Sequence, residues 1–219
     1  MQRHEAEENL RVIRSLMEKA TIYRAISAPT ALVGGVAATI IGGFLGATSS
    51  SEREHSHPVL FFIAWLSVLA VTGASNAYFI RRDAHRRSEK FVSPGMKMAL
   101  MALLPSHLVA AVATVISFAL LNHRYLGGMY LMLPYFWCTL YGMGLIAMNH
   151  FAPGSIIRLG WAFLFVGLLL IANSFLGFPE LFSGGERQAH LIMASTFGLF
   201  HLVYAALTWP RGATSAKSN

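Results

Sequence analysis

Two histidines, His107 and His201, have the residue type and the position to do chemistry in this sequence. Each falls near the middle of a long apolar segment, where ionisable side chains are rare and commonly mark ligand sites or proton paths. A helix rises 1.5 Å per residue, which places both imidazoles within about 4 Å of the middle of their segments, toward the same side. Equal depth is what a pair of ligands to one ion or cofactor requires.

The pair allows three chemical roles and one structural role. Two neutral imidazoles can ligate a b-type haem from opposite faces, bind another metal ion, or relay protons. Alternatively, each imidazole hydrogen-bonds a neighbour such as Tyr141, Tyr204 or Thr114 and holds helices together. Two of nine histidines match in depth readily by chance, so the pattern favours the structural role. Haem b is the one cofactor that the pair suggests.

A second group of metal-binding residue types lies in or beside the loops on one predicted side of the membrane. Within it, only His55 and His57 have a spacing that suggests a shared ligand. The pattern therefore favours solvated loop residues over a metal site. The members of the group are His55, His57, His123, His190, Glu52, Glu54, Glu180 and Glu186.

Catalytic motifs are absent from the sequence. The apolar segments contain no Asp or Glu, which argues against carboxylate-driven ion coupling and against aspartyl proteolysis. No glycine-rich phosphate loop, histidine-box array or serine-protease setting occurs. The single cysteine, Cys138, cannot form an intramolecular disulfide. These absences favour a non-enzymatic protein.

The composition indicates that lipid is the main solvent. Of the 219 residues, 55% are hydrophobic and 12% are charged, whereas soluble domains carry about a quarter charged residues. The net charge of +7 does not indicate nucleic-acid binding, because the basic residues flank apolar segments, as orientation signals do. We therefore expect the lipid bilayer as a partner and no nucleic acid.

Six apolar segments of about 20 residues each match the roughly 30 Å thickness of a hydrocarbon core. They cover residues 25–48, 58–80, 96–121, 128–149, 155–177 and 190–209. The predicted fold class is all-α, a polytopic membrane protein of six transmembrane helices with a preceding cytoplasmic amphipathic helix. Its parts are the amphipathic helix at 1–22, the six-helix domain at 23–210 and a disordered cytoplasmic tail at 211–219.

A basic loop at residues 81–90 predicts the orientation. Short basic loops are retained on the cytoplasmic side of a membrane, which puts both termini on that side. Of the 17 lysines and arginines, those that then fall outside are Arg53, Arg124 and Arg187. The loop is also a candidate contact for anionic lipid or a protein partner, through Arg81, Arg82, Arg86, Arg87 and Lys90.

Residues 5–22 have the periodicity of an amphipathic helix, with Leu10, Ile13, Met17 and Ala20 at three- and four-residue spacing. The pattern favours a helix that lies on the membrane surface or under the bundle. The alternative is a helix that docks a cytoplasmic partner. The charges of this segment nearly balance, which weakens attraction to anionic lipid and keeps the partner interpretation open.

The first apolar segment carries two rows of small residues at four-residue intervals. Small residues let helices approach closely, either within one chain or between two copies. Packing within the chain is favoured over a homo-oligomer contact. The rows are Ser27, Ala31, Gly35, Thr39, Gly43, Ala47 and Thr30, Gly34, Ala38, Gly42, Gly46.

Two prolines predict bends in neighbouring spans, Pro105 in the third and Pro134 in the fourth. Proline within a helix removes a backbone hydrogen bond and exposes the carbonyl one turn earlier. Bent neighbouring helices can enclose a cavity. A small solute could cross the membrane through such a cavity.

The N-terminus resembles that of a group of uncharacterised bacterial six-span integral membrane proteins. Those proteins begin with an ENLR-x-IR-x-x-ME-type segment, which here is residues 8–20, before a Gly/Ala-rich first span, which here contains Gly34 and Gly35. The resemblance implies a six-span protein of the bacterial inner membrane. It carries no activity over to this chain, but it draws attention to the N-terminal helix as a partner contact.

The sequence supports three functional hypotheses. The first is a non-enzymatic sensor, regulator or scaffold that contacts a cytoplasmic partner through residues 5–22 and the basic loop. The second is a membrane protein that binds b-type haem or a metal through His107 and His201. The third is a small-solute transporter that uses the bent third and fourth spans.

Overall fold

The computed structural model describes residues 5, 7–10, 27–49, 57–86, 92, 94–150, 152–176 and 185–209. Within these ranges all regular structure is helical and no strand occurs. The elements are α2 (Ala28–Thr48), α3 (Pro58–Arg86), α4 (Pro94–Ala119), η2 (Met129–Met132), α5 (Leu133–Ala147), α6 (Gly154–Leu176), α7 (Glu186–Met193), η3 (Ala194–Phe200) and α8 (His201–Thr208). Glu5 and residues 7–10 are helical; the rest of the predicted helix at 5–22, like the predicted tail at 211–219, lies outside the described residues.

Six helical stretches in the described part of the chain are long and apolar enough to cross a membrane. Each overlaps one of the six predicted segments, so the all-α, six-span prediction is confirmed in helix length and composition. Two of the stretches are composite, because η2 leads into α5, and α7, η3 and α8 run on as one helix.

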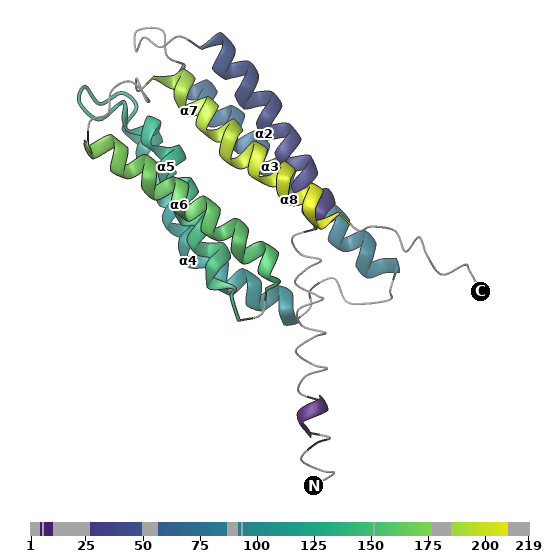
Figure 1. The fold of residues 1–219 in the computed structure, drawn as a ribbon. Helices are drawn as coiled ribbons and strands as arrows, with labels where there is room; N and C mark the ends of the chain where they lie inside the picture. Colours follow the sequence, from purple (N-terminus) through teal and green to yellow (C-terminus); the bar gives the residue numbers. More distant parts are fainter. Residues whose placement is uncertain are drawn as a thin grey trace.

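The helices form two groups (Figure 1). In one group, α2 packs against α3 and along the continuous helix α7–η3–α8, whereas in the other α5 packs against α4 and α6. Aromatic rings fill the seam between the groups. The ring centroid of Phe61 lies 5.4 Å from that of Tyr130 and 6.1 Å from that of Trp137, and Phe163 lies 4.9 Å from Phe197. The grouping departs from chain order because the last helix returns to the first two.

The small residues of α2 are used for packing within the chain. Every member of the row that contains Gly42 is buried: Thr30, Gly34, Ala38, Gly42 and Gly46. A Cβ at Gly42 would lie 2.8 Å from the carbonyl oxygen of His190 and 2.9 Å from the ring of Trp65. The other row is less enclosed, since a Cβ at Gly43 would meet nothing within 4 Å.

The two prolines have different effects. Pro105 lies inside α4, as predicted, so it interrupts the backbone hydrogen bonding of that helix. The predicted bend at Pro134 is wrong, because Pro134 occupies the first turn of α5, directly after η2. An amide hydrogen is not needed for helix hydrogen bonds at that position, so proline starts this helix instead of bending it.

The sixth span begins at Glu186, earlier than the predicted residue 190. The prediction that no Asp or Glu lies within a span is therefore wrong for Glu186, and it is also wrong for Asp83, because the second span runs to Arg86. The middle of the span, η3, is a π-helix. The hydroxyls of Ser195 and Thr196 both donate to the carbonyl oxygen of Ile192, at 3.0 and 2.7 Å, and so compete with backbone amides for that oxygen. Such wide turns are frequent at functional sites.

The second span continues as the helix α3 to Arg86, so the predicted loop is wrong for residues 81–86. Arginine and alanine favour helix, and no proline or glycine lies between residues 74 and 86 to end it. The buried residues of α3 all lie in its first half: Phe61, Phe62, Ala64, Trp65 and Val68. Figure 1 shows the last turns of α3 continuing past the end of α8.

Candidate functional site

The two histidines that could form a ligand pair by their depth both contact Tyr141. His107 lies on α4, Tyr141 on α5 and His201 at the start of α8. The Tyr141 ring centroid is 6.1 Å from that of His107 and 5.6 Å from that of His201. The two imidazoles make no ring contact with each other within the described residues. The structure thus brings them to one tyrosine instead of to one shared point.

His201 has a hydrogen-bond partner for each ring nitrogen. Nδ1 lies 2.8 Å from the carbonyl oxygen of Phe197, and because a carbonyl only accepts, Nδ1 carries the hydrogen. Nε2 then presents a lone pair, which accepts the Tyr141 hydroxyl at 3.0 Å. The ring is stacked on Phe197 at 15° and lies 5.5 Å from Phe163. His201 is a satisfied residue of the aromatic seam.

His107 repeats half of this arrangement. Its Nδ1 lies 2.9 Å from the carbonyl oxygen of Leu103, one turn earlier, so Nδ1 again carries the hydrogen. The hydroxyl of Ser106 also lies 3.4 Å from Nδ1 and donates to the same carbonyl at 3.0 Å. No described residue donates to Nε2. The side chain is exposed, on the span of which only 6% is buried, the lowest share among the six.

This geometry bears on the haem hypothesis. Ligation of one iron by both histidines needs both Nε2 lone pairs to point at the metal. The lone pair of His201 is engaged by Tyr141, whose ring also adjoins His107. Two-histidine ligation would therefore require the Tyr141 hydroxyl to leave His201 and the ring to move. In the described part of the chain, no group of three His, Cys, Asp or Glu residues is arranged to hold a metal ion.

The end of the bundle at the start of α3 holds a second polar cluster. Glu186 is 3% exposed and His190 is 0% exposed, so the prediction of solvated residues is wrong for both. A Glu186 carboxylate oxygen accepts the backbone N–H of His57 at 2.6 Å, and His190 Nδ1 accepts the indole N–H of Trp65 at 3.1 Å. The other oxygen of Glu186 lies 3.8 Å from His190 Nε2, which is too long for a hydrogen bond.

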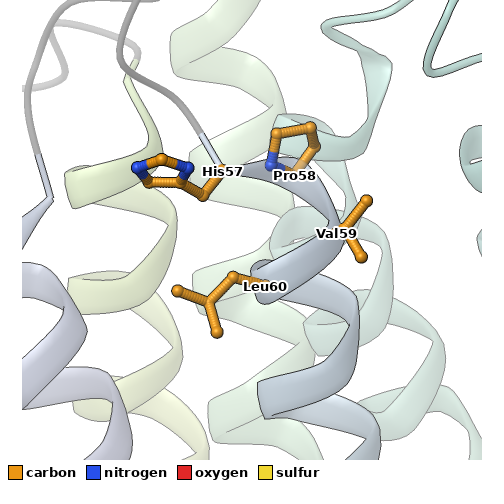
Figure 2. A pocket seen from close by; sticks show the side chains of 4 residues that line it. All are labelled: His57, Pro58, Val59 and Leu60. Atoms are coloured by element: carbon orange, nitrogen blue, oxygen red, sulfur yellow. The ribbon is translucent and has the colours of Figure 1, made fainter.

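An open hollow of about 390 Å³ lies beside this cluster, where α3 begins (Figure 2). Its lining among the described residues is His57, Pro58, Val59 and Leu60. Three of these are apolar, so the hollow offers one imidazole and little other polar chemistry. Four other members of the predicted metal group, His55, Glu52, Glu54 and Glu180, lie outside the described residues.

Sequence reasoning named Glu186 and His190 but assigned them to solvent. The spacing of four residues was the available signal, because it puts both side chains on one face of a helix. The helix start at Gly185 was not apparent from hydropathy, since Glu186, Arg187 and Gln188 are polar. The hydrogen bond of Trp65 to His190 could not be predicted from the sequence, because it joins helices that are far apart in the chain.

The basic end of the bundle is formed by the last turns of α3. Arg81, Arg82 and Arg86 are exposed there, and the guanidinium of Arg82 lies 5.5 Å from the centroid of the Phe79 ring. The two other predicted contact residues, Arg87 and Lys90, lie outside the described residues.

No protein-family model matches this chain, and neither a curated protein nor a solved structure matches it. Function is therefore argued from the geometry of three places. These are the basic end of α3, the histidines at Tyr141, and the Glu186–His190 cluster.

Proposed function

We propose that this protein is a non-enzymatic scaffold of the bacterial inner membrane that holds a cytoplasmic protein partner at the membrane surface. The observation that carries the proposal is the exposed basic end of α3, which extends past the rest of its group (Figure 1). Residues 5–22 supply a second contact. The proposal takes the orientation that the distribution of lysine and arginine favours, in which both termini and the basic end face the cytoplasm.

The length of α3 places its basic residues at and beyond the lipid headgroups. A helix of 29 residues is about 43 Å long, whereas a hydrocarbon core is about 30 Å thick. If Pro58 marks one boundary and the helix follows the membrane normal, Arg81 and Arg82 reach headgroup depth. Arg86 then lies about 12 Å past the core, beyond a headgroup region that is about 5–8 Å thick on each side. This reach favours a protein contact at the end of α3.

The basic end has little competing use within the described chain. Arg81 and Arg86 are exposed and form no ion pair with another described residue. Exposed arginines present planar groups that bind carboxylates with two hydrogen bonds. We therefore expect the partner to present an acidic face. Charge complementarity of this kind mainly raises the association rate and depends on salt.

The absence of catalytic geometry in the described chain supports a non-enzymatic role. Ser106 lies 3.4 Å from His107 Nδ1, yet its hydroxyl donates to the Leu103 carbonyl, and so does that nitrogen. That nitrogen has no lone pair with which to accept a proton. A serine nucleophile needs a base that can do so.

The test compares full-length wild type with an Arg81→Glu/Arg82→Glu/Arg86→Glu variant. Proteins crosslinked to each in cells are identified by mass spectrometry, then purified and rebound to the membrane protein in nanodiscs of neutral lipid. We expect a partner that binds wild type and loses at least tenfold in affinity with the triple variant. Deletion of residues 1–20 should also abolish capture without unfolding the bundle. Arg124→Glu, a single charge reversal in the turn between α4 and η2, is the control for a basic residue outside the basic end.

Two outcomes would overturn the proposal. One is a partner whose affinity for the triple variant and for wild type is the same. The other is that no protein rebinds in neutral nanodiscs, while anionic vesicles bind wild type more tightly than the triple variant. That second outcome would make the basic end a lipid contact only.

A further inference from the structure

His107 and His201 share the same hydrogen bond at Nδ1 but differ in whether Nε2 has a donor. Both donate from Nδ1 to the carbonyl four residues earlier, which leaves Nε2 of each as a hydrogen-bond acceptor. The Tyr141 phenol occupies Nε2 of His201, whereas no described residue reaches Nε2 of His107. We propose that Nε2 of His107 is a binding site for a membrane-soluble molecule that carries a phenolic hydroxyl.

The position of His107 makes an empty acceptor costly. His107 is the central residue of the 25-residue span Gly95–Ala119, and its side chain is exposed. Lipid chains offer no hydrogen-bond donor at that depth, and water is scarce there. An acceptor left without a partner in hydrocarbon loses the hydrogen bond it would make in water. A ligand that brings a donor and an apolar body restores that bond.

The required chemistry is a donor, not an acceptor or a cation. Nε2 has a single lone pair and, in this tautomer, no hydrogen. The chain already contains the matching interaction, since the phenol hydroxyl of Tyr141 lies 3.0 Å from Nε2 of His201. The same Tyr141 ring stands edge-on to His107 at 70°. A second aromatic ring placed on Nε2 would therefore join an existing aromatic cluster.

The surroundings of His107 suit an apolar ligand body. Leu104 and Leu100 lie one and two turns before His107 on the same face of α4, and they are 62% and 57% exposed. On α5, Gly144 lets the two helices approach closely, because a Cβ there would lie 2.6 Å from the hydroxyl oxygen of Ser106 and 3.1 Å from a methyl group of Leu103, with Cε1 of the imidazole 3.4 Å away. The imidazole therefore lies beside α5 at Gly144, while its side chain stays exposed on α4.

A second copy of the chain is a poorer occupant of this site. Two copies related by a twofold axis through His107 would bring one Nε2 lone pair against the other. Two acceptors cannot hydrogen-bond to each other, and no described hydroxyl next to His107 is free to donate, since Ser106 donates to Leu103. Because two acceptors cannot bond to each other, a small molecule with a hydroxyl donor suits Nε2 better than a second copy of the chain does.

The test uses the full-length protein in nanodiscs with two matched probes, 4-nonylphenol and its methyl ether, 4-nonylanisole. Binding is measured by equilibrium dialysis for wild type, His107→Phe and the control His150→Phe, which changes an exposed histidine after α5. We expect wild type and His150→Phe to bind the phenol roughly tenfold more tightly than His107→Phe does. We expect the ether to bind all three proteins equally weakly. In ¹⁵N-histidine spectra the phenol, but not the ether, should shift the Nε2 resonance of His107.

Three results would overturn the proposal. Equal binding of phenol and ether to wild type would show an apolar surface only. A Soret band in the purified protein that disappears in His107→Phe would assign Nε2 to haem iron. A dimer that dissociates in His107→Phe and excludes the phenol would assign the site to a second copy. If His107→Phe fails to fold, the comparison of phenol with ether on wild type and the Nε2 resonance still decide the matter.

Discussion

His201 and His107 form nearly the same hydrogen bond within their own helices, but only His201 has a described donor at Nε2. The Nδ1 hydrogen of each imidazole is donated to a backbone carbonyl of the preceding turn. His201 faces the seam between the two helix groups, where Tyr141 completes it. His107 lies on α4, the least buried span, and none of the described residues donates to its second nitrogen. The difference teaches that a histidine within a span becomes structural or available according to the environment of one nitrogen.

His190 extends the comparison toward complete burial. It is inaccessible to solvent, it accepts the indole N–H of Trp65, and its Nε2 stands near Glu186 without bonding to it. Three histidines of one chain thus form a series from fully buried to open. The series predicts the relative cost of removing each.

Replacement of His190 should have the largest effect. His190→Phe leaves the Trp65 indole and the buried Glu186 carboxylate without their neighbour, and we expect it to cost about 3 kcal/mol of unfolding free energy. The measurement is reversible unfolding in mixed micelles. His123→Phe, an exposed change at the same end of the bundle, is the control and should cost less than about 0.5 kcal/mol. Equal costs for the two variants would contradict the burial of His190.

Replacement of His201 should cost less than that of His190 but more than that of His107. His201→Leu leaves the Tyr141 hydroxyl unpaired within the seam, for an expected loss of about 2 kcal/mol. His107→Leu is the matched control, and it should be neutral or slightly stabilising because it removes an unpaired polar group from a lipid-facing surface. The same unfolding assay measures both. Equal destabilisation by the two variants would mean that His107 also has an internal partner.

Removal of the Tyr141 hydroxyl should cost less than removal of His201 and leave Nε2 of both histidines without a hydrogen-bond donor. Tyr141→Phe keeps the ring contacts and deletes one hydrogen bond, for a loss of about 0.5–1 kcal/mol. We expect its cost to shrink in a His201→Leu background, because the two changes remove the same bond. In ¹⁵N spectra the Nε2 resonance of His201 should move toward that of His107. An unchanged resonance would show that Tyr141 does not occupy this nitrogen.

The ends of two helices and the π-helix η3 could not be predicted from the sequence. Hydropathy located the six helices, but it ended α3 at residue 80 and started the sixth span at residue 190. Both errors have one cause. A helix continues through polar residues such as Arg81 and Glu186 when their backbone conformation is favourable, whereas hydropathy measures only side-chain solvation. The π-helix was missed because hydropathy carries no information on which carbonyl each backbone amide bonds.

What the sequence by itself determined is the number of helices long and apolar enough to cross a membrane, and the positions of His107 and His201 along two of them. Those properties depend on the length and composition of each segment, because a helix that crosses a hydrocarbon core needs about 20 mostly apolar residues. Only the tertiary structure decided which histidine nitrogen has a partner. That choice depends on Tyr141 of α5 meeting α8 on the seam and leaving the outer face of α4 uncovered. A hydrogen bond between helices is short and directional, so residue type and depth alone cannot specify it.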